Sequence, residues 1–476
     1  MHSPSLPRIA PLFLFVAPLH GQAEDAWLSY RNADERIVSA SAIADEENEV
    51  DLAWGDLNGD GTVDLVVVRK QPFMSYGKRS NVLLLNQDGQ LVNRTGAFAS
   101  RSDVEGDHGF GTPTADRDVE LADLDGDGWL DVVTATDLGG EAPKHITHPR
   151  IYRNLGATAA GRWGGLAHED ARFPQLVHLE SGAPLVPTFM AVAAGDLDDD
   201  GDVDLYFGDH DFVPAAPGEE RSSMQTPEVD TDDRLLLNDG AGHFSDGSAQ
   251  ASEDLRRSPF CNSVAIVDLN GDGLMDVVKQ TSFQRPAAAY YALQEEGGEQ
   301  RFPARQQIYA GRPYFVSTGD LNNDGRVDVI LSDNGLDVQL YNQDDGEGGV
   351  SWSEPQPFEF AFGEDDRFAG NNLIVDLDGD GWNDVIITDV DPEIPTYDRR
   401  AHVYHNLGVS EGASFPRLLE EREAPNDEGW VGAAGLSLSD LAATHDAAVL
   451  DVDGDGRMDL FLARKAGASL WLQAGE

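Results

Sequence analysis

A nine-residue pattern rich in carboxylates returns seven times along the chain. Each copy reads Asp-x-(Asp/Asn)-x-Asp-Gly-x-x-Asp and runs directly into a short apolar stretch. The copies lie 52 to 75 residues apart and begin at Asp56, Asp123, Asp196, Asp268, Asp320, Asp376 and Asp451. Side-chain oxygens at fixed spacing suit a hard divalent cation. The regular recurrence indicates one structural unit used seven times.

The spacing within each copy favours calcium, which takes roughly six to eight oxygen ligands. Side chains at places 1, 3 and 5 are expected to face one centre as the backbone curls, and the glycine at place 6 allows a sharp bend. Place 7 is expected to offer a backbone carbonyl, so its side chain is free to vary. The aspartate at place 9 closes the shell with both oxygens. Magnesium needs a stricter octahedral geometry, and loops without Cys or His do not favour zinc.

The candidate ligands occupy places 1, 3, 5, 7 and 9 of every loop. Loop by loop, they are Asp56, Asn58, Asp60, Thr62 and Asp64; Asp123, Asp125, Asp127, Trp129 and Asp131; Asp196, Asp198, Asp200, Asp202 and Asp204; Asp268, Asn270, Asp272, Leu274 and Asp276; Asp320, Asn322, Asp324, Arg326 and Asp328; Asp376, Asp378, Asp380, Trp382 and Asp384; Asp451, Asp453, Asp455, Arg457 and Asp459. Aspartate and glycine are also ordinary turn residues, which gives each loop a metal-free alternative. Chance does not repeat five fixed places seven times, so the sequence predicts up to seven Ca²⁺ sites.

The segments around each loop predict short antiparallel strands. In the third copy, residues 189–194, 205–208 and 234–238 have the pattern of strands, and a turn at Asp239-Gly240 leads to a fourth strand around His243-Phe244. A unit of this size cannot bury both faces alone, whereas units stacked in a closed ring can. We therefore expect an all-β protein: a seven-bladed β-propeller of four-stranded antiparallel blades, forming one domain over residues 24–476.

The two ends of the chain predict how the ring closes. The last unit stops after a third strand at residues 470–472, and an N-terminal strand around residues 36–42 is expected to complete it. Residues 27–32 also have the pattern of a third strand. This leaves two alternatives open, an extra edge strand or an eighth, incomplete blade.

The net charge indicates which classes of partner to exclude, and the N-terminal residues indicate where the protein is located. Among 476 residues, 86 are acidic and 33 basic, a net charge of −53 that argues against nucleic acid and anionic membrane surfaces as partners. His2 and Arg8 precede an apolar run at residues 9–19, too short to span a bilayer, and small residues then permit cleavage after Ala23. Residues 1–23 are therefore predicted to be a signal peptide. The mature protein is expected to be secreted, periplasmic or at the cell surface, without a membrane span. The single cysteine, Cys261, excludes an internal disulfide and is expected to be buried.

The full pattern resembles the FG-GAP/VCBS repeat family, the type found in the propeller of integrin alpha subunits. Residues 195–205 match the calcium segment of that family closely, whereas its Gly-Ala-Pro element is poorly kept. Aromatic residues near the start of the first strand match its Phe-Gly element, at Phe110-Gly111, Phe189, Phe260, Phe315 and Phe368. The resemblance covers nearly the whole mature chain. It implies a propeller with calcium in the loops between first and second strands, on one face of the disc.

The sequence contains no known catalytic motif. It lacks a Gly-x-Ser-x-Gly elbow and a His-Glu-x-x-His motif, and His402 and His405 have the setting of ordinary strand residues. The expected function is a non-catalytic binding, adhesion or structural module for an extracellular protein or glycan. The alternative is an extracellular lyase or hydrolase that acts on polysaccharide through a propeller face. The longer connections on the face opposite the loops are the expected binding surface, together with the acidic residues that follow the second strands, Asp137, Asp209, Asp333 and Asp389.

Overall fold

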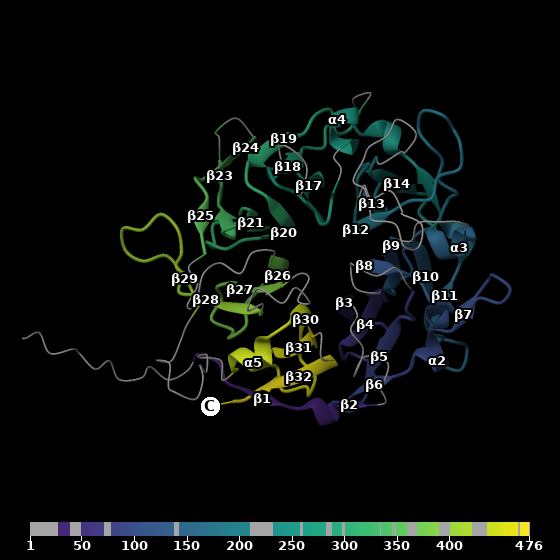
Figure 1. Cartoon of the computed structure of the whole chain (residues 1–476), viewed down its shortest axis with the longest axis horizontal. Coiled ribbons are helices and arrows are strands. Elements are labelled where there is room, and N and C mark those ends of the chain that lie inside the picture. Colours follow the sequence, from purple (N-terminus) through teal and green to yellow (C-terminus); the bar gives the residue numbers. More distant parts are fainter. Residues whose placement is uncertain are drawn as a thin grey trace, which may run out of the picture.

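The computed structural model of the chain is a ring of small antiparallel sheets (Figure 1). It describes residues 27–38, 49–70, 78–137, 142–209, 232–257, 260–281, 288–297, 300–333, 335–344, 346, 349–358, 369–389, 400–420, 436–464 and 467–475. The predicted signal peptide, Phe368 and most of the long connections after the second strands lie outside these residues. In the described part, no helix is long and apolar enough to cross a membrane.

Seven sheets form the blades, which we number in chain order and write from the inner strand outward. Blade 1 contains β3 (Glu49–Gly55), β4 (Asp64–Lys70), β5 (Val82–Asn86) and β6 (Leu91–Asn93), and blade 2 contains β8 (Asp116–Ala122), β9 (Asp131–Thr136), β10 (Arg150–Asn154) and β11 (Leu166–His168). Blade 3 contains β12 (Phe189–Gly195), β13 (Asp204–Asp209), β14 (Arg234–Asn238) and β15 (Phe244–Asp246), blade 4 contains β16 (Val264–Val267), β17 (Asp276–Thr281), β18 (Ala288–Ala292) and β19 (Gln306–Tyr309), and blade 5 contains β20 (Pro313–Gly319), β21 (Asp328–Asp333), β22 (Val338–Leu340) and β25 (Gln356–Pro357). Blade 6 contains β26 (Ala369–Val375), β27 (Asp384–Asp389), β28 (His402–Asn406) and β29 (Leu418–Leu419), and blade 7 contains β30 (Thr444–Leu450), β31 (Asp459–Arg464), β32 (Gly467–Gln473) and β1 (Tyr30–Asn32). The predicted all-β propeller of mostly four-stranded blades is confirmed.

The ring also contains a few short strands and helical turns outside the four-stranded blades. β2 (Ile37–Val38) and β7 (Arg101–Ser102) each add a parallel fifth strand, to blades 1 and 2 respectively. β23 (Asn342–Asp344) and β24 (Val350–Trp352) form a separate hairpin. The connections contain single turns of helix at α2 (Thr95–Phe98), α3 (Lys144–Thr147), α4 (Glu253–Arg256) and α5 (Leu438–Leu441), and 3-10 turns at η1 (Asp34–Arg36), η2 (Gly109–Gly111), η3 (Asp170–Arg172) and η4 (Ser248–Gln250).

The ring closes through β1, and the predicted closing strand at residues 36–42 is wrong. Tyr30 and Asn32 pair antiparallel with Gln473 and Trp471 of β32, so residues 30–32, within the predicted segment 27–32, supply the fourth strand of blade 7. Residues 34–36 then form η1, and β2 pairs with β6 of blade 1, while residues 39–42 lie outside the described part. Because the chain crosses to blade 1 at η1, the strand that pairs with β32 comes before η1. The inner strands of blades 7 and 1 contact directly, which gives seven blades and not eight.

The apolar core lies between neighbouring blades. Leu65 and Leu84 of blade 1, for example, pack with Phe461 and Leu470 of blade 7. The residue at place 2 of each loop is buried as well, at Leu57, Leu124, Leu197, Leu269, Leu321, Leu377 and Val452. Each sheet thus covers both faces against its neighbours, as stacked units require. Cys261 is buried as predicted, with Sγ 3.5 Å from the Ser263 carbonyl oxygen.

Candidate metal centres and the central cavity

Each acidic loop connects the inner strand of a blade to its second strand. The aspartate at place 1 organises the loop. In loop 1, Asp56 Oδ1 accepts hydrogen bonds from the amides of Gly59 and Asp60, at 2.8 and 3.1 Å, and Oδ2 accepts one from Gly61 at 2.9 Å. The bond from place 6 to place 1 recurs in all seven loops. The glycines at place 6 all have φ between 82° and 94°, which confirms the predicted bend.

Place 4 is also conformationally restricted, which the sequence analysis missed. Its residue has positive φ in every loop, and it is glycine in five of them. The other two are Asp199 and Asn323, with φ of 57° and 56°. Asp and Asn are the side chains that best tolerate this left-handed region. The recurrence of Gly, Asp or Asn at place 4 was the signal in the sequence.

The aspartate at place 9 is buried in every loop and has hydrogen bonds on both oxygens. Oδ2 accepts from the amide of place 2, at 2.8 to 3.2 Å. Oδ1 accepts from the amide of an Asn or Gln near the end of the third strand, at 2.6 to 2.9 Å. Burial raises the pKa of Asp131 and Asp204 to about 7, and that of Asp276 and Asp459 to about 6. A cation bound nearby would favour the ionised form of these carboxylates, as their backbone hydrogen bonds do.

The same Asn residues join neighbouring blades. Asn154 Nδ2 of blade 2 donates to the Leu57 carbonyl oxygen of loop 1 at 2.7 Å, and Asn238 of blade 3 donates to Leu124 of loop 2 at 2.8 Å. Equivalent bonds run from Asn86, Asn342 and Asn406 to the place-2 carbonyls of Val452, Leu269 and Leu321. Blades 4 and 7 have Gln294 and Gln473 at this position instead. The recurrence of Asn at the end of the third strand is visible in the sequence, but its role between blades is not.

The geometry of the loops fits a hard cation. Carboxylate oxygens of three residues lie within 4.8 Å of one another in four loops, at Asp123, Asp125 and Asp127; Asp196, Asp198 and Asp204; Asp376, Asp378 and Asp384; and Asp451, Asp453 and Asp459. The other three loops have Asn at place 3. Buried Oδ1 atoms of Asp125, Asp198, Asp202 and Asp453 have no hydrogen-bond partner in the protein. Buried carboxylate oxygens without a partner are unfavourable unless a cation or water satisfies them.

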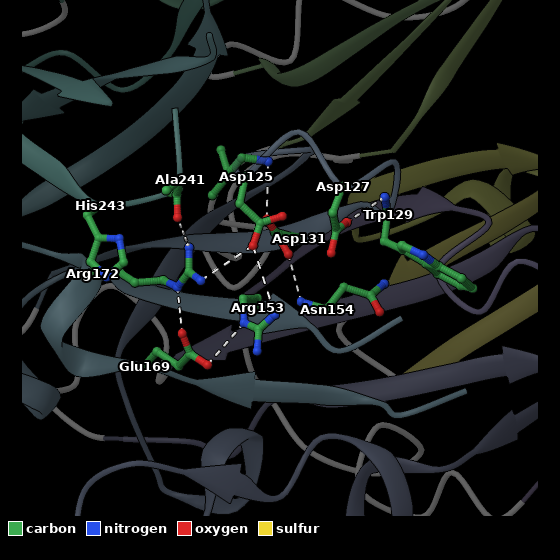
Figure 2. A network of polar contacts seen from close by, with 12 residues as sticks. Asp125, Asp127, Trp129, Asp131, Arg153, Asn154, Glu169, Arg172, Ala241 and His243 are labelled. Carbon is green, nitrogen blue, oxygen red and sulfur yellow. Dashed lines mark hydrogen bonds and ion pairs between the residues drawn. The ribbon is translucent and has the colours of Figure 1, made fainter. Parts of the chain in front are cut away.

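Positive side chains approach place 3 in some loops. In loop 2, Arg172 Nη2 lies 3.4 Å and Arg153 Nη1 lies 4.0 Å from Asp125 Oδ2. Figure 2 shows Glu169 between the two guanidinium groups, with Arg172 Nη1 also donating to the Ala241 carbonyl oxygen at 2.7 Å. The arginines belong to blade 2 and its outer connection, so the sequence spacing of the loop could not reveal them.

His405 has a setting that the sequence analysis also missed. Its Nε2 lies 3.5 Å from Asp378 Oδ2 in loop 6, and its ring stacks on Trp27 with centroids 4.1 Å apart. With Asp378 and Asp380 it forms a group that could hold a metal ion. His405 is therefore beside a candidate site and is more than an ordinary strand residue. His402, in contrast, is buried against Glu420, with 2.9 Å between Nδ1 and Oε1.

A central cavity of about 340 Å³ lies among the inner strands of the blades. Its lining comes mainly from the first halves of these strands, away from the acidic loops, and includes Trp54, Phe315 and Asn371. Asp51, Asp118 and Asp446 line it from blades 1, 2 and 7, and Asp51 is close enough to the other two for their charges to raise its pKa. Burial raises the pKa of all three, and that of the neighbouring Glu120 to about 8. These acids are far apart in sequence and were not predicted as a group.

The predicted acidic residues after the second strands serve internal contacts. Asp137 pairs with Arg117 Nε at 2.8 Å, and Asp209 accepts a hydrogen bond from Thr188 Oγ1 at 3.2 Å. Asp333 is buried and accepts a hydrogen bond from the Arg312 amide. The side chain of Asp389 lies outside the described part. The expectation that these residues form part of a binding surface is therefore not supported for the first three.

Comparison with known proteins identifies the repeat. The FG-GAP-like repeat family matches residues 56–134 and 223–278, which contain loops 1, 2 and 4. No curated protein matches the chain. A solved structure of a lectin from Agrocybe aegerita, described as recognising non-reducing terminal N-acetylglucosamine specifically, is 14% identical to this chain with a TM-score of 0.44. The match covers 90% of this chain and 86% of that one. The resemblance found in the sequence is thus confirmed: the chain contains FG-GAP-like repeats in these two regions and folds as a seven-bladed β-propeller.

Proposed function

We propose that the protein is an exported, calcium-binding propeller that acts as a non-catalytic binding or adhesion module for an extracellular protein or carbohydrate. In this proposal, bound calcium stabilises the fold. The observation that carries the calcium role is the presence in loop 3 of two buried oxygens without partners, Asp198 Oδ1 and Asp202 Oδ1, beside further carboxylates. Calcium ligates such oxygens without strict geometry.

The repeated loops explain why calcium would stabilise the fold. Carboxylates a few ångströms apart repel one another, and burial of the place-9 aspartates adds a desolvation cost. A bound divalent cation removes both penalties. Because the place-9 aspartate also accepts bonds from place 2 and from the third strand, the ordered loop would hold two strands of its blade in register.

The central cavity is the proposed site for the ligand. Its volume of about 340 Å³ is within the range of ligand pockets. Asp51, Asp118 and Asn371 offer hydrogen-bonding groups, while Trp54 and Phe315 offer apolar surface. This combination suits sugar hydroxyls and ring faces, or a polar segment of a protein.

The alternative function, a polysaccharide hydrolase or lyase, is favoured by one observation in the same cavity. Glu120, with a pKa raised to about 8, lies near the ionisable Asp118. General acid catalysis needs a carboxyl group that keeps its proton near neutral pH, beside a second carboxyl group with another role.

Arrays of glycans and extracellular proteins, probed with the chain from residue 24 in calcium, would test the proposal. Specific retention that is lost in Asp118→Asn, but kept in the exposed control Glu105→Gln, is the expected result. Appearance of new reducing ends or unsaturated sugars would instead support the enzyme. Retention that is equal in both variants would refute the cavity as the ligand site.

A further inference from the structure

The seven loops differ in the positive charge that neighbouring side chains place beside their carboxylates. Relative to its number of carboxylates, loop 3 has the least positive charge beside it. Loop 3 has a carboxylate at all five candidate places, Asp196, Asp198, Asp200, Asp202 and Asp204. Among the residues that the structure describes, no Lys, Arg or His nitrogen lies within 4.0 Å of these carboxylates. Arg301 acts on Asp198 only from a longer distance.

The other loops with aspartate at place 3 have basic side chains of the protein beside them. In loop 2, Arg172 is 6% exposed and is held by Glu169 and the Ala241 carbonyl oxygen, so it is fixed beside Asp125. In loop 6, His405 lies beside Asp378.

Loop 7 has more positive neighbours than any other described loop. Arg31 and Arg36 lie 3.7 and 3.9 Å from Asp453 Oδ2, and Arg457 pairs with Asp455. Arg31 belongs to β1, so the strand that closes the ring also brings positive charge to this loop. Blade 7 is therefore the blade that depends least on an added cation for its closure.

The remaining loops have fewer carboxylates in their own sequence. Place 3 is an uncharged amide in loops 1, 4 and 5, at Asn58, Asn270 and Asn322. In loop 5, Arg326 also pairs with Asp324, with 2.5 Å between Nη2 and Oδ2.

Buried carboxylate oxygens without a hydrogen-bond partner also distinguish loop 3. Loop 3 has two without a hydrogen-bond partner, at Asp198 and Asp202, whereas loops 2 and 7 have one each and the other loops have none within the described residues. Place 7 in loop 3 is thus unusual, because an acidic side chain is present where the other loops have Thr, Trp, Leu or Arg.

We propose that loop 3 is the tightest calcium site of the ring and fills first, and that loop 7 is among the weakest. The inference rests on the proposed calcium role and extends it to an order of filling. The physical reason is that the affinity of an oxygen site for calcium rises with the number of its charged ligands. Fixed cations beside a site subtract from that attraction.

Calcium titration of the calcium-free chain from residue 24, by calorimetry with a competing chelator, tests this order. Asp198→Asn and Asp453→Asn make the same change at place 3 of loops 3 and 7, and asparagine already stands at that place in loops 1, 4 and 5. Asp198→Asn is expected to weaken the first binding event by on the order of tenfold. Asp453→Asn is expected to leave that event unchanged.

Asp199→Asn is the matched control. It removes one charge from the exposed place 4 of loop 3, where asparagine tolerates the φ of 57°. Its effect on the first event should be clearly smaller than that of Asp198→Asn. Equal effects of all three variants, or a larger effect of Asp453→Asn, would overturn the order. Absence of calcium binding by the unchanged chain would refute the calcium role itself, which separates the two failures.

Discussion

Asn154→Ala should destabilise the ring by opening the contact between blades 1 and 2. The Asn154 side chain is fully buried and makes four hydrogen bonds. Nδ2 donates to the carbonyl oxygens of Leu57 and Leu130, at 2.7 and 3.0 Å. Oδ1 accepts from the Gly156 amide and from Trp163 Nε1, at 3.1 and 2.8 Å. The backbone amide, which binds Asp131, is kept in the variant.

The expected loss follows from these bonds. A buried hydrogen bond between uncharged groups contributes about 1 kcal/mol net, so removal of four predicts a loss of about 3 to 4 kcal/mol in the free energy of unfolding. Urea unfolding followed by tryptophan fluorescence, with calcium held constant, measures this loss.

Gln294→Ala provides the comparison, because Gln294 occupies the equivalent position in blade 4 and its buried amide atoms have no hydrogen-bond partner. Its truncation is expected to cost less than about 1 kcal/mol, because it removes a buried polar group that gains nothing in the fold. A loss below about 1 kcal/mol for Asn154→Ala, or equal losses for the two variants, would refute the role of Asn as a link between blades.

Three further predictions concern calcium, pH and ring closure. Excess chelator should lower the melting temperature of the chain in calorimetry, since the crowded loop carboxylates then repel; unchanged melting would contradict the calcium role. Glu120→Gln should raise the melting temperature at pH 8 and leave it unchanged at pH 4. The pKa of Glu120 in the folded state, near 8, lies above its ordinary value of 4.5. The native state therefore loses stability as the pH rises between these two values, whereas the glutamine variant does not. An equal effect on the melting temperature at both pH values would argue against this reasoning. Deletion of residues 24–32 should expose the edge of β32, lower the melting temperature and promote association seen by light scattering, whereas a monomer of unchanged melting would exclude closure by β1.

The sequence by itself determined the repeated unit and the conformation of its loops. The places from Asp196 to Asp204 lie within nine residues, so their spacing alone predicts the bend at Gly201 and the strands on either side. Seven such units with no helical periodicity predicted the propeller for the same reason: each blade is built from consecutive residues, and a ring is the arrangement that covers all of their faces.

The tertiary structure alone decided which distant residues meet. Asp51 reaches Asp118 and Asp446 only because blades 1, 2 and 7 are neighbours around the axis. Arg172 reaches Asp125 through the outer edge of blade 2, and β1 closes the ring because the chain crosses to blade 1 directly after it. Contacts of this kind depend on the order and register of blades. They leave no periodic trace along the chain, and so no local pattern could have predicted them.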